Sequence, residues 1–337
     1  RSVCELRNSE IPPWRFLLQW YEHTFVKHRG ERGRVVAEKK SSLDETPLMR
    51  QLRNDMELRK RLEKATFDAP EDTRIMAVAN QKGGVGKTSS AVNIAVALAK
   101  GGLNVLVIDS DPQGNASTAL GIPHDPEIAS LYDVLIEDEP LSAIVTPSPE
   151  AESLLCAPAT IDLSGAEIEL VPMVARESRL KNALADYFAE REEKGQARLD
   201  YVLIDCPPSL GLLTINALVA AREVFMPIQA EYYALEGIAM LWKNIDLIRK
   251  HLNPDLVVST ILLTMYDART RLAAQVAEDV REHFPTQTLD TVIPRSVRIS
   301  EAPSYAQTVL NYDPNSTGAL AYRAAAHEIS RRLEPKN

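Results

Sequence analysis

Residues 81–89 read Gln81-Lys82-Gly83-Gly84-Val85-Gly86-Lys87-Thr88-Ser89, and this stretch decides the fold. It follows an apolar run, 75–79, that predicts a buried strand, and it precedes a segment rich in Ala, Val and Ile that predicts a helix. Glycines let consecutive backbone N–H groups converge on an anion, and a helix N-terminus favours negative charge. Strand, glycine loop and helix together therefore predict a phosphate-binding site.

The loop departs from the common pattern G-x-x-x-x-G-K-[ST], because Gln81 stands at its first glycine position. It fits the variant K-G-G-x-G-K-[ST], which adds a second lysine, Lys82, at the entrance of the loop. We expect Lys87 to reach the β- and γ-phosphates of a nucleotide and the Thr88 hydroxyl to coordinate Mg²⁺. The alternative, a glycine-rich turn with two solvated lysines, is disfavoured by the strand and helix on either side.

Predicted strands and helices alternate from residue 73 onward. The expected strands are 74–79, 104–109, 201–205, 223–228, 256–263 and 288–293. The expected helices are 87–100, 127–136, 174–193, 210–221, 233–251, 269–284 and 316–333. This rhythm predicts one α/β domain over residues 73–335, a doubly wound, mostly parallel sheet of the P-loop NTPase type, with its ligand at the carboxyl ends of the strands.

Two of the predicted strands end in carboxylates. The apolar run 105–108 leads into Asp109 and Asp111, and the run 201–204 leads into Asp205. Carboxylates at strand ends beside a phosphate loop suit the placement of a metal ion and of water. An aspartate at a strand end is common by itself. Two such strands in this order after the loop favour a nucleotide site.

Three segments give the chain a specific resemblance: DSDPQGNAS at 109–117, DCPPSLG at 205–211 and VIPRSVRISEAPSYAQTVLNYDPNSTGALAY at 292–322. With the loop around Lys82, they resemble the deviant Walker A ATPases of the ParA family, which partition chromosomes and plasmids. The resemblance covers residues 73–333 and is most like chromosomal members from actinobacteria. It implies a slow ATPase that uses ATP and Mg²⁺.

The resemblance also implies roles for individual residues. Lys82 is expected to reach across a nucleotide-sandwich homodimer, Asp111 to position the attacking water, and Asp109 and Asp205 to orient the waters of the metal ion. The implied nucleotide-binding residues are Lys82, Gly84, Val85, Gly86, Lys87, Thr88, Ser89, Pro294 and Ser296. The implied metal-binding residues are Thr88, Asp109 and Asp205, and the implied catalytic residues are Lys82, Lys87 and Asp111.

The implied contacts with adenine and with DNA each have an alternative explanation. Ser296 stands where the family commonly has an asparagine that holds adenine, so a plain turn is the alternative for this residue. Arg269, Arg271 and Arg295 correspond to a basic patch for nonspecific double-stranded DNA, although each alone also suits a solvated surface charge. The implied partners are a second copy and a ParB-type centromere-binding protein, in the cytoplasm and on the nucleoid.

Composition limits how DNA is bound. The 337 residues are 45% hydrophobic and 25% charged, with a formal net charge of −9. Residues 1–72 carry 15 Lys and Arg against 13 Asp and Glu, so the remaining residues, 73–337, carry a net −11. Any DNA contact on that acidic body is expected to use a local basic patch and to depend strongly on salt.

Residues 1–72 are expected to form an extension outside the ATPase domain, with an exposed amphipathic helix at 45–65 and a linker at 66–73. Residues 1–44 are either an upstream extension or a docking segment. No apolar run reaches about eighteen residues, so no membrane span is expected.

Three other functions are alternatives to the partitioning ATPase. A MinD-like ATPase that cycles on membranes shares the loop, but it requires a terminal amphipathic helix, and residues 318–333 are Ala-rich with few bulky apolar side chains. An iron-protein-like reductase requires cysteines near the dimer axis, and only Cys206 lies near the predicted nucleotide. A scaffold without nucleotide is disfavoured by the presence of Lys87, Thr88, Asp111 and Asp205 together.

Overall fold

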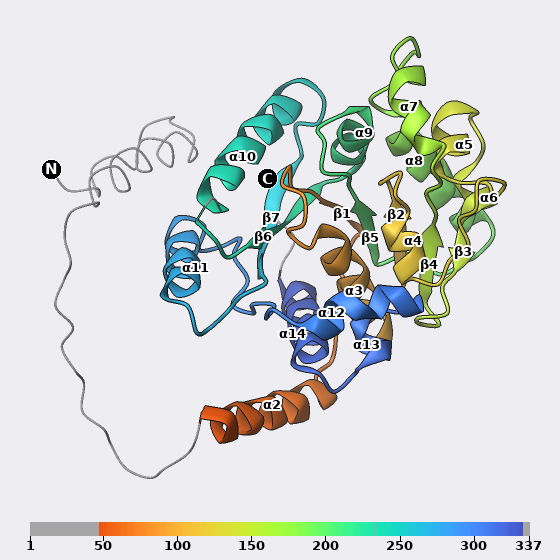
Figure 1. Cartoon of the computed structure of the whole chain (residues 1–337). Coiled ribbons are helices and arrows are strands. Elements are labelled where there is room, and N and C mark those ends of the chain that lie inside the picture. The colour runs from red at the N-terminus through yellow and green to blue at the C-terminus, as the bar shows by residue number, and fades with distance from the viewer. Residues whose placement is uncertain (1–46, 233, 333–337) are drawn as a thin grey trace, which may run out of the picture.

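The computed structural model describes residues 47–232 and 234–332 (Figure 1). In these residues seven strands form one sheet in the order β3-β4-β2-β5-β1-β6-β7. All neighbouring strands are parallel except β3, which runs antiparallel to β4. The strands are β1 (Arg74–Val78), β2 (Val105–Asp109), β3 (Thr146–Pro147), β4 (Leu154–Ala157), β5 (Tyr201–Asp205), β6 (Glu223–Gln229) and β7 (Val257–Thr264).

Helices cover both faces of this sheet (Figure 1). The long helices are α2 (Pro47–Glu63), α3 (Lys87–Lys100), α8 (Arg179–Glu193), α9 (Leu212–Ala220), α10 (Ala234–His251), α11 (Arg271–His283) and α14 (Thr317–Arg331). The short ones are α4 (Asn115–Ala119), α5 (Leu131–Ile136), α6 (Leu141–Ile144), α7 (Leu163–Glu169), α12 (Val297–Glu301), η2 (Ala302–Tyr305) and α13 (Val309–Tyr312).

Side-chain alternation along the strands divides the core into two layers. Met76 and Val78 of β1 pack with α3 and α14 on one face, whereas Ala77 packs on the other face with residues of α5 to α11. Because successive side chains of a strand point to opposite faces, a strand buried on both sides is apolar throughout. The predicted doubly wound α/β fold is therefore confirmed.

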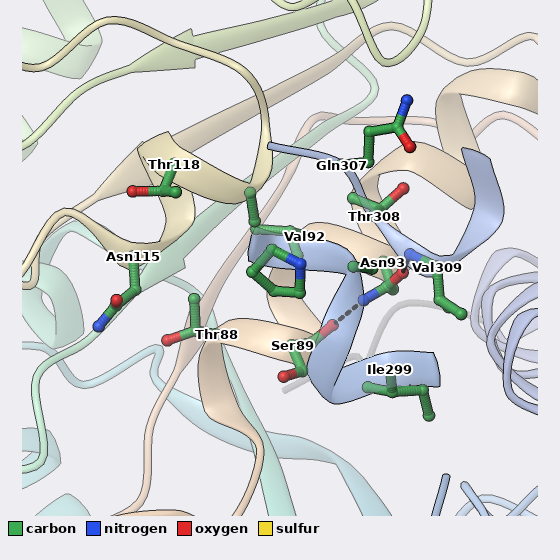
Figure 2. A pocket seen from close by; sticks show the side chains of 13 residues that line it. Thr88, Ser89, Val92, Asn93, Asn115, Thr118, Ile299, Gln307, Thr308 and Val309 are labelled. Carbon is green, nitrogen blue, oxygen red and sulfur yellow. Dashed lines mark hydrogen bonds between the residues drawn. The ribbon is translucent and has the colours of Figure 1, made fainter. Parts of the chain in front are cut away.

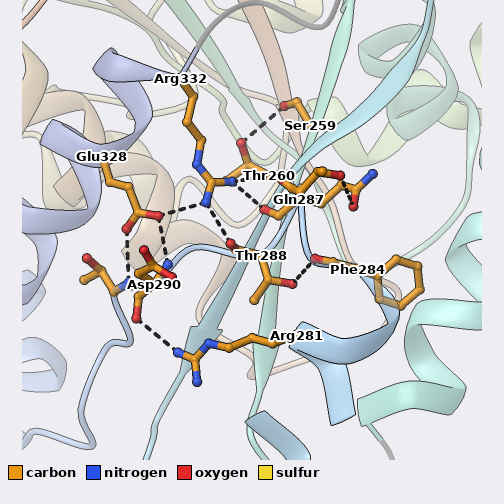
Figure 3. A network of polar contacts seen from close by, with 11 residues as sticks. Ser259, Thr260, Arg281, Phe284, Gln287, Thr288, Asp290, Glu328 and Arg332 are labelled. Atoms are coloured by element: carbon orange, nitrogen blue, oxygen red, sulfur yellow. Dashed lines mark hydrogen bonds and ion pairs between the residues drawn. The ribbon is translucent and has the colours of Figure 1, made fainter. Parts of the chain in front are cut away.

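The strand predicted at 288–293 is wrong. This segment makes only isolated bridges, Ile261 to Thr288 and Tyr266 to Pro294. The backbone N–H groups of Asp290 and Thr291 donate to the carboxylate of Glu328 on α14, at 2.8 and 3.0 Å, and Arg332 holds the same carboxylate (Figure 3). The ends of the segment still bond to the backbone of β7, since the N–H groups of Leu289 and Ile293 donate to Ile261 and Leu263 at 2.9 and 2.8 Å. Between these ends the carboxylate of Glu328 interrupts the strand pattern.

Other differences concern short elements and boundaries. The strands β3 and β4 and the helices α4, α6, α7, α12, η2 and α13 were not predicted. The helix predicted from 127 begins at Leu131, because Ser130 and Asp133 form a capping box there. The helix predicted from 174 begins at Arg179.

The helix predicted at 45–65 is α2, which begins in the described residues at Pro47. It is not exposed along its whole length, because Leu62 is buried against Leu320 and Ala324 of α14. The interpretations of residues 1–44 lie outside the described residues.

Arg74 at the start of β1 is buried and joins the two ends of the domain. Its guanidinium group forms two hydrogen bonds with the carboxylate of Glu223, at 2.7 and 2.6 Å. It also donates to the backbone oxygens of Ile329 and Arg332, at 2.9 and 3.4 Å. Although burial opposes the charge, these bonds raise the pKa of Arg74, so the group stays charged.

Candidate nucleotide site

The predicted site residues meet at one edge of the sheet. In the strand order, β5 lies between β2 and β1, and Asp205 at the end of β5 is in register with Asp109 on one side and Val78 on the other. The glycine loop follows β1 directly. The topology therefore places both strand-end aspartates beside the loop, as the sequence predicts for a parallel sheet.

The conformation of the loop explains two of its glycines. Gly84 and Gly86 have φ angles of +73° and +85°, in the left-handed region that side chains disfavour. Gly86 also precedes α3 as its N-cap residue. The loop is anchored from β7, since the hydroxyl of Thr264 donates to the backbone oxygen of Val85 at 2.7 Å.

Lys87 begins α3 and points inward. It is 7% exposed, and its ammonium group donates to the backbone oxygen of Lys82 at 3.4 Å. Burial lowers the pKa of Lys87, and the nearby Asp205 and Asp111 carboxylates oppose this effect. A buried ammonium group whose one hydrogen bond in the described residues is long is suited to binding an anion such as a phosphate.

Lys82 has a different environment. Its ammonium group is ion-paired with Glu231, and its side chain remains 44% exposed. Its backbone N–H donates to the side chain of Asn80 at 3.0 Å, and Asn80 in turn donates to the backbone oxygen of Pro227 at 2.8 Å. The entrance of the loop is thus held against β6 at Pro227 and against Glu231, just after β6.

Asp109 is fully buried and well hydrogen-bonded. One of its carboxylate oxygens accepts from the backbone N–H and from the hydroxyl of Ser117, each at 2.8 Å, and the other accepts from the backbone N–H of Asp111 at 3.2 Å. Burial nevertheless raises the pKa of Asp109 to about 6. Asp111, only 9% exposed, accepts a hydrogen bond from the backbone N–H of Gln113 at 3.1 Å.

Asp205 is also fully buried, but neither of its carboxylate oxygens accepts a well-formed hydrogen bond in the described residues. Burial first, and then the Asp109 carboxylate, raise its pKa well above the ordinary value, although the neighbouring Thr88 hydroxyl acts in the opposite direction. Two unpartnered carboxylate oxygens beside a second carboxylate and a hydroxyl fit a hydrated Mg²⁺ ion, which prefers oxygen ligands.

A cavity of about 220 Å³ opens beside the first turn of α3 (Figure 2). Thr88 and Ser89 line one side, and Ile299, Ala302 and Pro303 line another. The remaining lining residues are Val92, Asn93, Asn115, Thr118, Ala119, Gln307, Thr308 and Val309.

Asn93 fixes one wall of this cavity. Its side chain donates to the backbone oxygen of Ser89 at 2.7 Å and accepts from the backbone N–H of Val309 at 3.0 Å. The sequence offered one signal for this wall, the segment 292–322, but only Pro294 and Ser296 of that segment were predicted to contact nucleotide. Neither of these two residues lines the cavity, and Ser296 precedes α12 without a side-chain capping bond.

Two of the three arginines predicted to bind DNA surround one carboxylate. Asp267 forms two 2.8 Å bonds with the guanidinium group of Arg269, whose side chain is 88% exposed. The hydrogen bonds from Arg269, with a smaller effect of Arg295, lower the pKa of Asp267 to about 2. Arg271 is the first residue of α11, after the N-cap Thr270.

Comparisons with known proteins agree with this geometry. The AAA domain family matches residues 73–258. The chain is 47% identical over 264 residues to the chromosome partitioning protein ParA of Myxococcus xanthus, covering 78% of this chain and 90% of that protein. It is 49% identical over 257 residues to the sporulation initiation inhibitor protein Soj of Bacillus subtilis, covering 76% and 98%. A solved structure of cobyrinic acid a,c-diamide synthase from Mycobacterium smegmatis with bound ADP and magnesium has a TM-score of 0.63 and 38% identity, covering 75% of this chain and 92% of that one.

Proposed function

This chain belongs to the ParA/Soj family of chromosome-partitioning proteins, and from that membership we propose that it is a partitioning ATPase that forms a nucleotide-sandwich dimer on DNA. It is an ATPase, and its cofactors are ATP and Mg²⁺. The observation that carries the proposal is the convergence of Lys87, Asp109 and Asp205 on the glycine loop at the carboxyl edge of the sheet.

The chemistry follows from charge and position. Bound Mg²⁺ supplies positive charge beside the phosphates. The loop from Gly84 to Ser89 holds the phosphates through its backbone N–H groups, and Lys87 compensates their charge from a buried position. Thr88, Asp109 and Asp205 would hold the metal ion and its waters. Asp111 orients the attacking water or accepts its proton.

Dimerisation is proposed to use Lys82. The ammonium group is partly exposed and paired with Glu231. Release from Glu231 would allow it to reach the phosphates of a second copy, where it compensates charge that develops during hydrolysis. The pairing within one chain is then the resting arrangement of this lysine.

DNA binding is proposed to use Arg269, Arg271 and Arg295, through phosphate contacts that carry no base readout. A dimer presents two such patches, which raises the effective affinity of each. A ParB-type centromere-binding protein would stimulate hydrolysis and release the dimer from DNA, so that the centromere complex follows a gradient of bound dimers over the nucleoid. Pro294 and Ser296 are proposed to contact the base of ATP from beside this patch.

The test is DNA binding by the full chain with ATP, with ADP and without nucleotide. We expect tight binding with ATP only, equal for unrelated duplex sequences and weakened by salt. Binding that ignores the nucleotide would contradict the switch. The MinD-like alternative predicts ATP-dependent flotation with anionic liposomes; in the described residues no helix has the length and apolarity to cross a membrane.

A further inference from the structure

Four aliphatic side chains on and beside α7 face solvent. Ile161, Ile168, Val171 and Val174 are 55, 77, 55 and 89% exposed; we call these four residues the α7 surface. Helical-type backbone hydrogen bonds, such as Ser164 to Ile161 and Val171 to Ile168, extend the turns of α7 at both ends. Spacings of seven and three residues therefore place the first three on one side of this run.

The backbone that presents these side chains is fixed from inside the protein. The fully buried Asn216 of α9 donates to the backbone oxygen of Arg176 at 2.7 Å and accepts from the backbone N–H of Leu180 at 3.2 Å. Arg176 in turn donates to the backbone oxygen of Val171 at 2.6 Å. A single exposed aliphatic residue is ordinary, but four on a segment held this way indicate a binding surface.

The surroundings of the α7 surface are acidic. Residues 161–178 contain four carboxylates against one arginine. Those of Asp162 and Glu169 are exposed, whereas Glu177 is paired with Arg176 and Glu167 turns toward Gly211. The hydrogen bond from Tyr132 to Glu169 is 3.0 Å, and this bond first, then burial and the charges of Glu169, Glu137 and Asp162, raise the pKa of Tyr132. Apolar side chains flanked by the carboxylates of Asp162 and Glu169 complement a protein segment that carries aliphatic and basic residues, and they disfavour DNA.

Two contacts join α7 to the nucleotide site. The hydroxyl of Ser117 donates to Asp109 and accepts from the backbone N–H of Ala159 at 3.2 Å, just before α7. The carboxylate of Glu167 on α7 lies against Gly211, the last residue of the loop that follows Asp205, and occupies the space that a side chain at position 211 would take. These two contacts therefore connect α7 and the residues just before it to the segments that follow both strand-end aspartates.

We propose that the α7 surface is the docking site for a basic, aliphatic segment of the protein that stimulates hydrolysis, and that docking acts on the site through Glu167 and Ser117. This inference rests on the proposed function, because it names the surface used by the proposed ParB-type partner. Binding of the stimulating segment moves α7, and the loop after Asp205 shifts because Glu167 contacts Gly211.

The test measures ATP hydrolysis by the full chain as the ParB-type protein of the same genome is titrated in with DNA. The double variant Ile168→Ser, Val174→Ser is expected to keep the basal rate and to raise the half-maximal partner concentration roughly tenfold or more. Both positions are highly exposed, so the fold is retained. The matched control is Met240→Ser, Leu247→Ser on α10, where the two side chains are 54 and 52% exposed; it should behave like wild type.

A second variant separates docking from transmission. Glu167→Ala is expected to bind the partner with unchanged affinity, measured by fluorescence anisotropy, but to lose most of the stimulated maximal rate, with the basal rate and melting temperature unchanged. A loss of basal rate or of melting temperature would show a merely structural role for Glu167 and overturn its part in transmission.

The remaining outcomes are distinct. If the partner stimulates the Ile168→Ser, Val174→Ser variant as strongly as the wild type, only this inference is overturned. If the partner never stimulates the wild type, the proposed function is overturned as well. If the variant loses ATP-dependent dimerisation by light scattering without partner, the α7 surface belongs to a second copy, and the docking proposal is overturned.

Discussion

Lys82 and Glu231 are ion-paired within one chain, 149 residues apart in the sequence. The pair is partly exposed, with side chains 44 and 30% accessible, so it contributes only about 0–1 kcal/mol and is easily opened. A lysine that serves a second copy must first leave this partner. Glu231 therefore competes with the dimer for the same charge.

The first prediction tests that competition. Glu231→Gln should increase the ATP-dependent dimer fraction at a given concentration, by up to about fivefold in the dimerisation constant, because the pair no longer has to be broken. Light scattering with and without ATP measures it. Glu190→Gln, which removes the exposed pair with Lys194, is the matched control. A Lys82→Ala variant that dimerises and hydrolyses ATP like wild type would remove the role proposed for Lys82.

The second prediction concerns the water-positioning carboxylate. Asp111→Ala should bind ATP and dimerise, yet turn over on the order of 10²-fold more slowly, because Asp111 does not hold phosphate in our proposal. Phosphate release with saturating ATP measures the rate, and Asp125→Ala, at an exposed aspartate, serves as the control. Lys87→Ala should instead lose nucleotide binding. Unchanged turnover in Asp111→Ala would transfer the role to another group, with Asp109 the first candidate.

The third prediction concerns Asp267, the carboxylate that lies near Arg269 and Arg295. Arg295→Glu should weaken all duplex sequences alike and reduce the dependence of affinity on salt, and Asp267→Asn should do the opposite, because it releases Arg269 from its ion pair. Anisotropy titrations over a range of salt concentrations measure both effects. ATP-driven dimerisation is the internal control and should not change. If the triple variant Arg269→Glu, Arg271→Glu, Arg295→Glu binds DNA like wild type, another surface makes the contact.

The fourth prediction follows from the raised pKa of Asp205. A carboxyl group whose pKa is higher in the folded than in the unfolded protein binds more protons when folded, so its burial costs stability above the unfolded pKa. Without nucleotide, Asp205→Asn should therefore raise the melting temperature at pH 8, and the gain should shrink as the pH falls toward 4. With Mg²⁺ and ATP the order should reverse, since only the wild type gains from binding. Scanning calorimetry of both proteins, without ligand and with Mg²⁺ and ATP, measures the melting temperatures. An Asp205→Asn variant that melts below the wild type at pH 8 without ligand would contradict this prediction.

The sequence predicted the fold and the glycine loop because both depend on local patterns. Apolar runs, glycines and strand-end aspartates lie within a few residues of each other, and parallel pairing brings them to one edge. The partner of Lys82 was not predictable in this way, because Glu231 comes close only through the pairing of β1 with β6.

The strand wrongly predicted at 288–293 has a similar cause. Its buried residues Leu289 and Ile293 give it an apolar pattern, but the backbone N–H groups between them bond to Glu328, almost forty residues later. The cavity wall at Asn93 likewise depends on Val309, which lies 216 residues away. Contacts between distant segments leave no periodic signal in the sequence.

The buried contacts of Arg74 bear on how the chain folds during synthesis. The strand β1 lies between β5 and β6, whose residues emerge from the ribosome more than a hundred positions later, and its first residue bonds to the backbone at Ile329. While residues 79–200 are synthesised, this apolar strand therefore has both edges unpaired, a condition that favours association between nascent chains. The pairing of the strand that carries the glycine loop is complete once β6 has emerged, and the bond from Arg74 to Ile329 forms only after α14 has emerged.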